Sequence, residues 1–145
     1  MKICLVVANY YPKISNNLLQ GATKLLIKNN IKHYKKIFVP GVFEIPTIIS
    51  SCIDRHDAFI ALGCVIKGKT PHFNLISTAV INAIMDLSVK YKNPIGNGII
   101  TCLNKKQAFL RSHPNKKNKG GEAAEAALSL LGILKNESKW SVAES

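Results

Sequence analysis

The segment from Gly63 to Phe73 gathers the side chains that are best suited to chemistry. Its first eight residues, Gly-Cys-Val-Ile-Lys-Gly-Lys-Thr, satisfy the G-x-x-x-x-G-K-[ST] pattern of a nucleotide-binding P-loop. Lys69 and Thr70 are suited to binding an anion, and His72 follows closely with an imidazole, a side chain that serves in proton transfer. The segment therefore predicts an anion site beside a proton-transfer group.

A working P-loop is not the favoured interpretation of this segment. Cys64, Val65 and Ile66 prolong the apolar run that begins at Ala58, so a strand is expected to continue through the supposed phosphate cradle. None of the other apolar runs leads into an aspartate that would help to hold magnesium. A P-loop NTPase or phosphotransferase is kept as the alternative enzyme class.

The composition describes an ordinary globular chain with an excess of positive charge. The 145 residues are 47% hydrophobic and 19% charged, which predicts one domain over residues 1–145, with a short polar segment, 136–145, as a candidate mobile tail. All of the 20 basic residues are Lys except Arg55 and Arg111, and the net charge is +12. The lysines are dispersed and are not interleaved with aromatic residues, which favours a solvated surface over nucleic-acid binding.

Apolar runs and cysteines indicate the compartment. No run reaches the roughly 18 to 20 apolar residues that cross a bilayer, and the N-terminal run Ile3–Ala8 has no cleavage site, so it predicts a strand and not a signal peptide. Cys4, Cys52, Cys64 and Cys102 are far apart and form no Cys-x-x-Cys pair. Buried reduced thiols are favoured over disulfides or a metal site, and the expected location is cytoplasmic without membrane attachment.

Strands and helices are expected to alternate along the chain and to position these groups. Continuous apolar runs predict buried parallel strands over 3–8, 36–39, 58–66 and 98–103. Helical periodicity predicts helices over 15–29, with Ser15 as N-cap, and over 45–55, 74–91, 105–112 and 122–135. The alternation predicts an α/β fold with a four-stranded parallel sheet covered by helices on both faces.

A sheet of this kind binds ligands beyond the carboxyl ends of its strands. The segments that follow the first three strands are Asn9–Pro12, Pro40–Pro46 and Lys67–Phe73. Aromatic rings, a carboxylate, a histidine and lysines therefore converge on one edge of the predicted sheet. This convergence favours a binding site over ordinary loop polarity.

Taken together, these segments resemble the lumazine synthase family of riboflavin biosynthesis. The matching pieces are, in chain order, 18–22, 39–46, 57–58, 62–73, 98–101, 107–108, Arg111, 118–120, 123–124 and 126–127. The most specific are Pro-Gly-Val-Phe-Glu-Ile-Pro (40–46) and Gly-Cys-Val-Ile-Lys-Gly-Lys-Thr-Pro-His (63–72). The resemblance implies a flavodoxin-like three-layer αβα sandwich. It also implies a transferase that condenses 5-amino-6-(D-ribitylamino)uracil with 3,4-dihydroxy-2-butanone 4-phosphate to 6,7-dimethyl-8-ribityllumazine, with neither cofactor nor metal.

The resemblance also assigns roles to particular residues. It implies that His72 transfers protons during imine formation, phosphate elimination and ring closure. It implies that Tyr10 stacks on the pyrimidine ring, and that Lys69, Thr70 and Arg111 hold the phosphate of the butanone substrate. The further substrate-binding residues that it implies are Val42, Phe43 and Glu44 around the pyrimidine and ribityl chain, Cys64, Val65 and Ile66 as the adjoining wall, Asn97 and Lys119.

Three residues depart from the family pattern. Asn97 stands where many members have an aromatic residue, so an amide is expected to close the pocket there. Lys69 stands where glutamate is common and adds positive charge beside the phosphate, and Lys67 replaces the usual arginine. None of the three removes a catalytic group.

The family also implies an assembly. Its sites lie between neighbouring subunits of a pentamer or of a multiple of pentamers, with Asn97 from one chain and Arg111 and His72 from the other, and riboflavin synthase is a further candidate partner. A second alternative is a non-catalytic lumazine- or flavin-binding protein on the same scaffold. Such a protein would keep Tyr10 and Phe43 but would not need His72 or Arg111.

Overall fold

Strands and helices alternate from one end of the chain to the other. The structure is a computed structural model that describes residues 1–144, with the side chains of residues 1–137. The strands are β1 (Ile3–Ala8), β2 (Lys35–Val39), β3 (Ala58–Ile66) and β4 (Ile95–Cys102). The helices are α1 (Pro12–Lys28), α2 (Ile45–Ser51), α3 (His72–Tyr91), α4 (Lys105–Ser112) and α5 (Lys119–Glu144), and a single 3-10 turn, η1 (Val42–Glu44), precedes α2.

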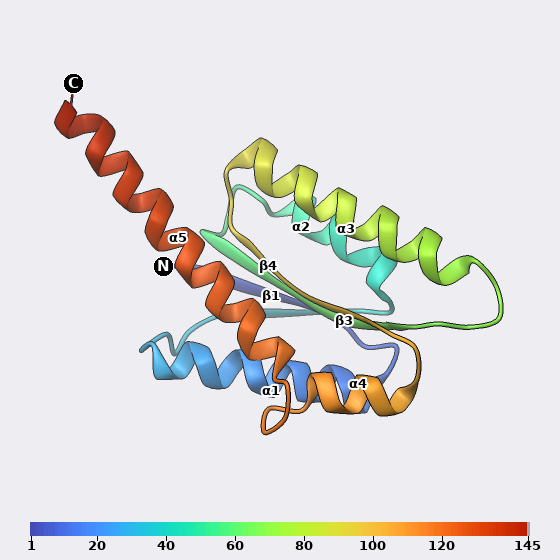
Figure 1. The fold of residues 1–145 in the computed structure, drawn as a ribbon. Coiled ribbons are helices and arrows are strands. Elements are labelled where there is room, and N and C mark those ends of the chain that lie inside the picture. The colour runs from blue at the N-terminus through green and yellow to red at the C-terminus, as the bar shows by residue number, and fades with distance from the viewer. Residues whose placement is uncertain (145) are drawn as a thin grey trace.

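The four strands form one sheet in the order β2-β1-β3-β4, and every neighbouring pair is parallel. Helices α1, α4 and α5 lie on one side of this sheet and α2 and α3 on the other, which gives three layers (Figure 1). The predicted α/β fold with a four-stranded parallel sheet is therefore confirmed. The backbone of α5 continues as a helix to Glu144 through the segment expected to be a tail, and the mobility of that segment stays a prediction.

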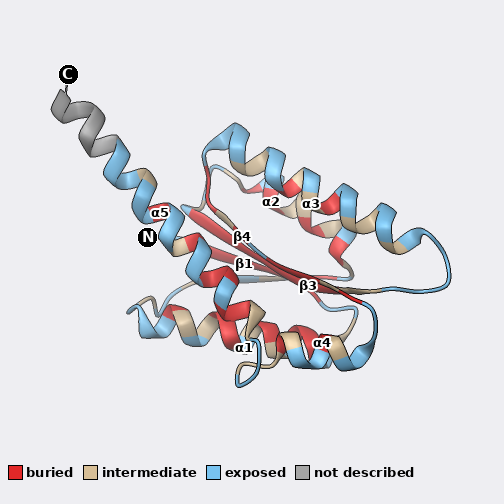
Figure 2. Ribbon diagram, viewed as in Figure 1, coloured by how far each residue is buried: buried red, intermediate tan, exposed pale blue. Residues whose placement is uncertain are grey.

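The sheet separates two apolar cores because successive residues of a strand point to opposite faces. On the side of α1 and α5, Ile3, Leu5 and Val7 of β1 pack with helix residues. On the side of α2 and α3, Cys4 and Val6 belong to the other core. Burial is concentrated in β1, β3 and most of β4, whereas the outer faces of the helices are exposed (Figure 2). Strand β2 was predicted to be buried but is largely exposed, because it lies at the edge of the sheet.

The start of α1 differs from the prediction. Ser15, expected as the N-cap, lies inside the helix and is buried, and its hydroxyl donates a hydrogen bond to the carbonyl of Ala8 at the end of β1. The helix begins instead at Pro12, which suits a first turn because its missing N–H would have no partner there. Ser15 thus fixes α1 to the strand before it.

Two other element boundaries differ from the prediction because of contacts with residues far away in the sequence. The second helix ends at Ser51, because the amide Nδ2 of Asn93 donates to the carbonyls of Ile53 and His56 and turns the chain toward β3. The last strand begins at Ile95, before the predicted start at 98, and Gly96 lets α5 approach it: a Cβ at Gly96 would collide with the carbonyl of Ala123.

The remaining shifts are small. Helix α5 begins at Lys119, three residues before the predicted start, and α3 begins at His72. Helix α3 has the length and, with a mean hydropathy of 1.2 over its most apolar stretch, the composition of a membrane span. Its residues Val80 and Ile84, however, are buried in the core beneath it, which is the packing of a helix that covers a sheet.

Candidate functional site

The segments after the first three strands meet around one cavity of about 230 Å³ at the carboxyl edge of the sheet. The residues that line it are Tyr10, Tyr11, Gly41, Val42, Phe43, Cys64, Val65, Ile66, His72 and Ile76. They come from the loop after β1, from the loop and turn after β2, from the end of β3 and from the start of α3. The cavity therefore collects Tyr10, Val42, Phe43, the wall 64–66 and His72, all of which the sequence placed in one site.

The apolar wall of the cavity depends on close packing between η1 and β3. Val42 is buried in the core, whereas the rings of Tyr10 and Phe43 are 71% and 60% exposed and lie at the mouth. A Cβ at Gly63 would lie 2.6 Å from the Cγ1 of Val42 and 3.0 Å from the Cβ of Ala8. Because no side chain fits there, Gly63 allows η1 to rest on β3.

Gly63 therefore has a packing role and does not begin a phosphate cradle. Strand β3 continues through Ile66, as predicted, and the N–H of Lys67 donates to the carbonyl of Cys102 at 2.8 Å, which extends the pairing with β4. Extended residues do not turn consecutive N–H groups around a phosphate. Helix α3 then begins only at His72, after the exposed residues 67–71.

His72 is the first residue of α3 and lines the cavity beside the aromatic mouth. The side chain is exposed, and its backbone N–H lies 3.4 Å from the Oγ1 of Thr70. Ile76 lies one helical turn further on the same face and lines the cavity as well. An imidazole at the wall of an aromatic cavity can pass protons to and from a planar ligand that is bound there.

Six predicted residues do not line this cavity, and three of them, Glu44, Asn97 and Lys119, make local contacts elsewhere. The Oε1 of Glu44 accepts a hydrogen bond from the N–H of Gly41 at 2.9 Å, which closes η1. The Oδ1 of Asn97 accepts from the N–H of Ile99 at 3.0 Å on β4, the edge strand next to β3.

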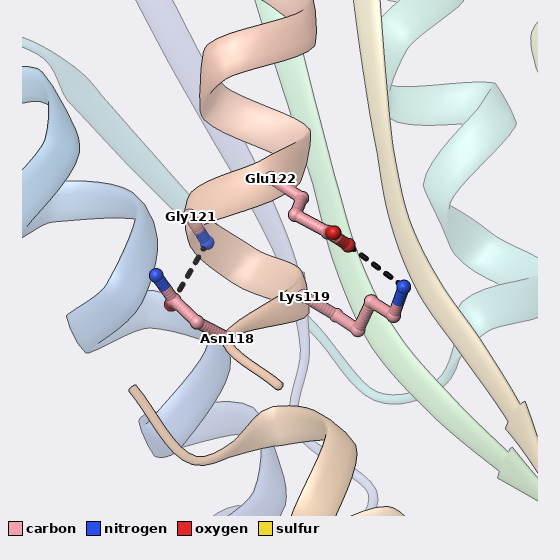
Figure 3. A network of polar contacts seen from close by, with 4 residues as sticks. All are labelled: Asn118, Lys119, Gly121 and Glu122. Atoms are coloured by element: carbon pink, nitrogen blue, oxygen red, sulfur yellow. Dashed lines mark hydrogen bonds and ion pairs between the residues drawn. The ribbon is translucent and has the colours of Figure 1, made fainter. Parts of the chain in front are cut away.

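The third of them, Lys119, lies at the start of α5. Its Nζ lies 2.8 Å from the carboxylate of Glu122, while the side-chain oxygen of Asn118 accepts a hydrogen bond from the N–H of Gly121 at 3.2 Å (Figure 3). Asn118 adopts a left-handed backbone conformation, with φ of 48°, which asparagine tolerates better than most residues. The ion pair and the cap together fix the first turn of α5.

The residues expected to bind phosphate lie outside the lining of the cavity. Lys69 and Thr70 belong to the exposed loop before α3. Arg111 is half-buried on α4, where its Nη1 donates to the carbonyl of Thr101 at 2.7 Å and lies 3.7 Å from the sulfur of Cys102. Arg111 thus points its guanidinium toward the carboxyl end of β4.

The sulfur of Cys102 also accepts a hydrogen bond from the thiol of Cys64, on the neighbouring strand β3. This hydrogen bond and the positive charge of Arg111 outweigh burial and lower the pKa of the Cys102 thiol from 9.0 to about 7. The same hydrogen bond, followed by burial, raises the pKa of Cys64, the donor. The lowered pKa of the pair therefore belongs to Cys102, beside Arg111, and the raised pKa belongs to Cys64 in the cavity wall.

Three lining residues were missed by the sequence analysis, although each stands beside a residue that was found. Tyr11 follows Tyr10, and the two rings make an edge-to-face contact with centroids 4.9 Å apart. Gly41 lies in the same loop as Val42, and the spacing of four residues on a helix relates Ile76 to His72. The helical spacing was a usable signal for Ile76.

The fold is an α/β fold of flavodoxin-like architecture, and the aromatic, histidine-containing cavity at the carboxyl edge of its sheet is a candidate small-molecule site. The family model described as 6,7-dimethyl-8-ribityllumazine synthase matches residues 1–135. Relatives include "6,7-dimethyl-8-ribityllumazine synthase 1" of Rhodopseudomonas palustris, 42% identical over 95% of this chain and 88% of its own length. A protein of Bartonella tribocorum with the name "6,7-dimethyl-8-ribityllumazine synthase" is 43% identical over 92% of this chain and 89% of its own length. The chain belongs to the 6,7-dimethyl-8-ribityllumazine synthase family, which confirms the resemblance seen in the sequence.

Proposed function

We propose that this chain is a lumazine synthase, a transferase that joins 5-amino-6-(D-ribitylamino)uracil to 3,4-dihydroxy-2-butanone 4-phosphate and releases phosphate and water. The observation that carries the proposal is the cavity in which Tyr10 and Phe43 meet His72, in a chain that belongs to the family over residues 1–135. No observation favours a P-loop enzyme or a non-catalytic flavin-binding protein.

The aromatic mouth would bind the pyrimidine of the first substrate. Tyr10 and Phe43 expose large faces at the cavity, and an aromatic face stacks on a planar heterocycle. The buried Val42 and the wall from Cys64 to Ile66 would close the inner side and exclude water from the ring. The carboxylate of Glu44 accepts a hydrogen bond from the Gly41 N–H through one oxygen, and its second oxygen would accept a hydrogen bond from a ribityl hydroxyl.

His72 would shuttle protons at the reacting carbons. Imine formation consumes and returns protons, phosphate elimination removes a proton from carbon, and ring closure releases water, so each step needs a group that gains and loses a proton near neutral pH. The imidazole lies at the cavity wall and two residues beyond Thr70, in the loop expected to bind phosphate. It can therefore serve the carbon chain of a substrate whose phosphate is held by that loop.

The phosphate would be held by Lys69 and Thr70 together with Arg111. The contact of Arg111 with the Thr101 carbonyl uses Nη1 and leaves the other donors of the planar guanidinium for a phosphate. Within one chain, Asn97 and Lys119 make their contacts outside the cavity. In the assembly they would contribute to the site of a neighbouring subunit.

Two observations support an assembly in which a neighbouring chain completes the site, and membership of the family is the ground for proposing pentamers or multiples of pentamers. The cavity, at about 230 Å³, is smaller than the roughly 300 to 1,000 Å³ of a typical small-molecule site, so a pair of substrates needs further walls. Large apolar side chains are also exposed near the carboxyl edge, among them Phe38, Leu103 and Phe109. A neighbouring chain would cover these side chains and complete the site. We further propose a cytoplasmic enzyme that hands its product to riboflavin synthase.

The test is a condensation assay with both substrates in the presence of EDTA, followed by the absorbance of the lumazine product. We expect product without metal, nucleotide or cofactor. Tight binding of the lumazine without turnover would instead identify a binding protein. Hydrolysis of ATP with magnesium, in a sample that forms no lumazine, would identify the P-loop alternative.

A further inference from the structure

The opposite edge of the sheet holds a cluster of metal-ligating side chains that takes no part in the proposed reaction. The sulfurs of Cys4 and Cys52 and one ring nitrogen of His56 all lie within 4.8 Å of one another. Cys4 lies at the start of β1, Cys52 directly follows α2, and His56 lies shortly before β3. The three residues are therefore at the amino edge of the sheet, away from the cavity lined by His72.

We propose that Cys4, Cys52 and His56 form a structural site for a divalent metal ion of zinc type. Two thiolates and an imidazole are ligands that zinc prefers, and zinc–sulfur and zinc–nitrogen bonds of about 2.3 and 2.0 Å put neighbouring ligand atoms about 3.5 to 3.8 Å apart. The three ligand atoms lie within 4.8 Å of one another, so each pair needs to move closer by at most about 1 Å to reach that separation.

The charges of the ligands select the ion. Cys4 and Cys52 are buried in the core under α2 and α3, where an uncompensated charge is costly. Two thiolates and a neutral imidazole cancel the charge of a divalent ion, whereas a monovalent copper ion would leave one negative charge in that core. Calcium and magnesium are excluded because they prefer oxygen ligands.

The surrounding contacts hold the imidazole beside the thiols. The Nδ1 of His56 lies 3.4 Å from the carbonyl of Cys52, and its ring packs edge to face on Phe59 with centroids 5.3 Å apart. The carbonyl of His56 accepts from the Nδ2 of Asn93 at 2.9 Å, which fixes the turn from Cys52 to His56. A metal site gains from such outer contacts because the ligands are oriented before the ion arrives.

The fourth ligand would be water. His56, one of the three proposed ligands, lines a second cavity of about 330 Å³ together with Asn93. Among the buried side-chain nitrogen and oxygen atoms of the described residues, the Oδ1 of Asn93 is one of two that have no hydrogen-bond partner. An acceptor oxygen without a partner, on a residue that lines this cavity, suits a hydrogen bond from a water molecule bound to the ion.

The experiment uses the full chain, purified with reductant, stripped with a chelator and titrated with cobalt(II) as a spectroscopic probe. We expect one ion per chain, a near-ultraviolet thiolate-to-cobalt band, visible bands of a tetrahedral site, and displacement of the cobalt by zinc. The midpoint of thermal unfolding should rise with zinc, because an ion that binds only the folded chain stabilises it. The absence of a thiolate-to-cobalt band in the folded, reduced protein would overturn the proposal.

Variants distinguish this site from the other thiols. His56→Gln and Cys52→Ser should each weaken cobalt binding by at least about tenfold and abolish the shift in the unfolding midpoint with zinc. Cys102→Ser, which alters the thiol pair on the other face of the sheet, is the matched control and should leave the cobalt spectrum unchanged. Circular dichroism checks that each variant folds. Loss of the band in Cys102→Ser, or its persistence in His56→Gln with unchanged affinity, would contradict the assignment.

Discussion

Two parts of the candidate active site, the proposed ring-binding part and the proposed phosphate-binding part, differ in how far a single chain builds them. The ring-binding part, with Tyr10, Val42 and Phe43, already encloses a cavity together with His72. The phosphate-binding part is dispersed: Lys69 lies in an exposed loop and Arg111 lies on α4 against the Thr101 carbonyl. The apolar walls of the cavity assemble because burial of apolar surface stabilises the fold. The cations Lys69 and Arg111 repel each other, so nothing favours their approach until an anion binds between them. The difference suggests that the ring pocket is preformed and that substrate completes the phosphate site.

The first way to test this comparison is to remove the proposed proton-transfer group, His72, from the preformed part. His72→Ala should lower kcat by about 10²-fold, the lower end for a general acid or base, while KM for both substrates changes little. Steady-state kinetics with each substrate varied in turn provide the measurement. His33→Ala is the matched control, because His33 is exposed in the connection before β2 and outside the cavity. A His72→Ala enzyme with unchanged kcat would remove His72 from the mechanism.

The second test removes a cation from the dispersed part. Arg111→Ala should raise KM for the butanone phosphate at least about tenfold, because a charge-assisted hydrogen bond contributes roughly 1.5 to 3 kcal/mol. The KM for the pyrimidine substrate should stay within about twofold. Combining Arg111→Ala with Lys69→Ala should exceed the sum of the two single effects, since each cation partly replaces the other. An unaltered KM for the phosphate substrate in Arg111→Ala would mean that the phosphate is bound elsewhere.

The third test concerns the packing beneath the ring pocket. Gly63→Ala should lower the free energy of unfolding by about 1 to 3 kcal/mol, because its Cβ would press on Val42 and Ala8. Gly68→Ala is the control within the same P-loop-like pattern: a Cβ there meets no atom within 4 Å. Urea unfolding measures both. If the pattern were a phosphate cradle, Gly68→Ala would instead affect ligand binding and Gly63→Ala would leave stability unchanged.

The sequence predicted which segments meet at the preformed part because their convergence depends on local patterns. The uninterrupted apolar run from Ala58 to Ile66 predicted β3 over its full length, and the groups that follow the strands had to meet at one edge. The start of β4 was missed because Gly96 and Asn97 interrupt the apolar run, and only the approach of α5 explains the glycine.

The dispersed part could not be predicted in the same way. The sequence predicted a phosphate-binding role for Arg111 but not its position. Its hydrogen-bond partner is the backbone carbonyl of Thr101, and every residue has such a carbonyl, so no sequence pattern identifies it. The cluster of Cys4, Cys52 and His56 escaped for a related reason: its members come from three segments that only the completed sheet brings together. Motif spacing along the chain detects sites within one loop and misses those that several strands assemble.

The smallest expected effect concerns Cys102, which joins the two parts because its thiol contacts both Cys64 at the cavity wall and Arg111. Its pKa is about 7 in the folded chain and 9.0 ordinarily, so the folded state releases this proton more readily than the unfolded state. By linkage, the thiolate of Cys102 stabilises the folded state fully above about pH 9. This contribution decreases as the pH falls from 9 to 7 and is absent below about pH 7.

Cys102→Ser should therefore flatten the rise in unfolding free energy between pH 7 and 9, a rise of at most about 1.4 kcal/mol per pH unit for one proton. Urea unfolding at a series of pH values measures it. Arg111→Ala should flatten the same rise in part, because the guanidinium contributes to the lowered pKa while the hydrogen bond from Cys64 remains. Above pH 9 the raised pKa of Cys64 acts in the opposite direction, which confines the test to this window. A parent chain whose stability rises no more steeply than that of Cys102→Ser would show that Arg111 lies beside a neutral thiol, and the two parts of the site would then be electrostatically independent.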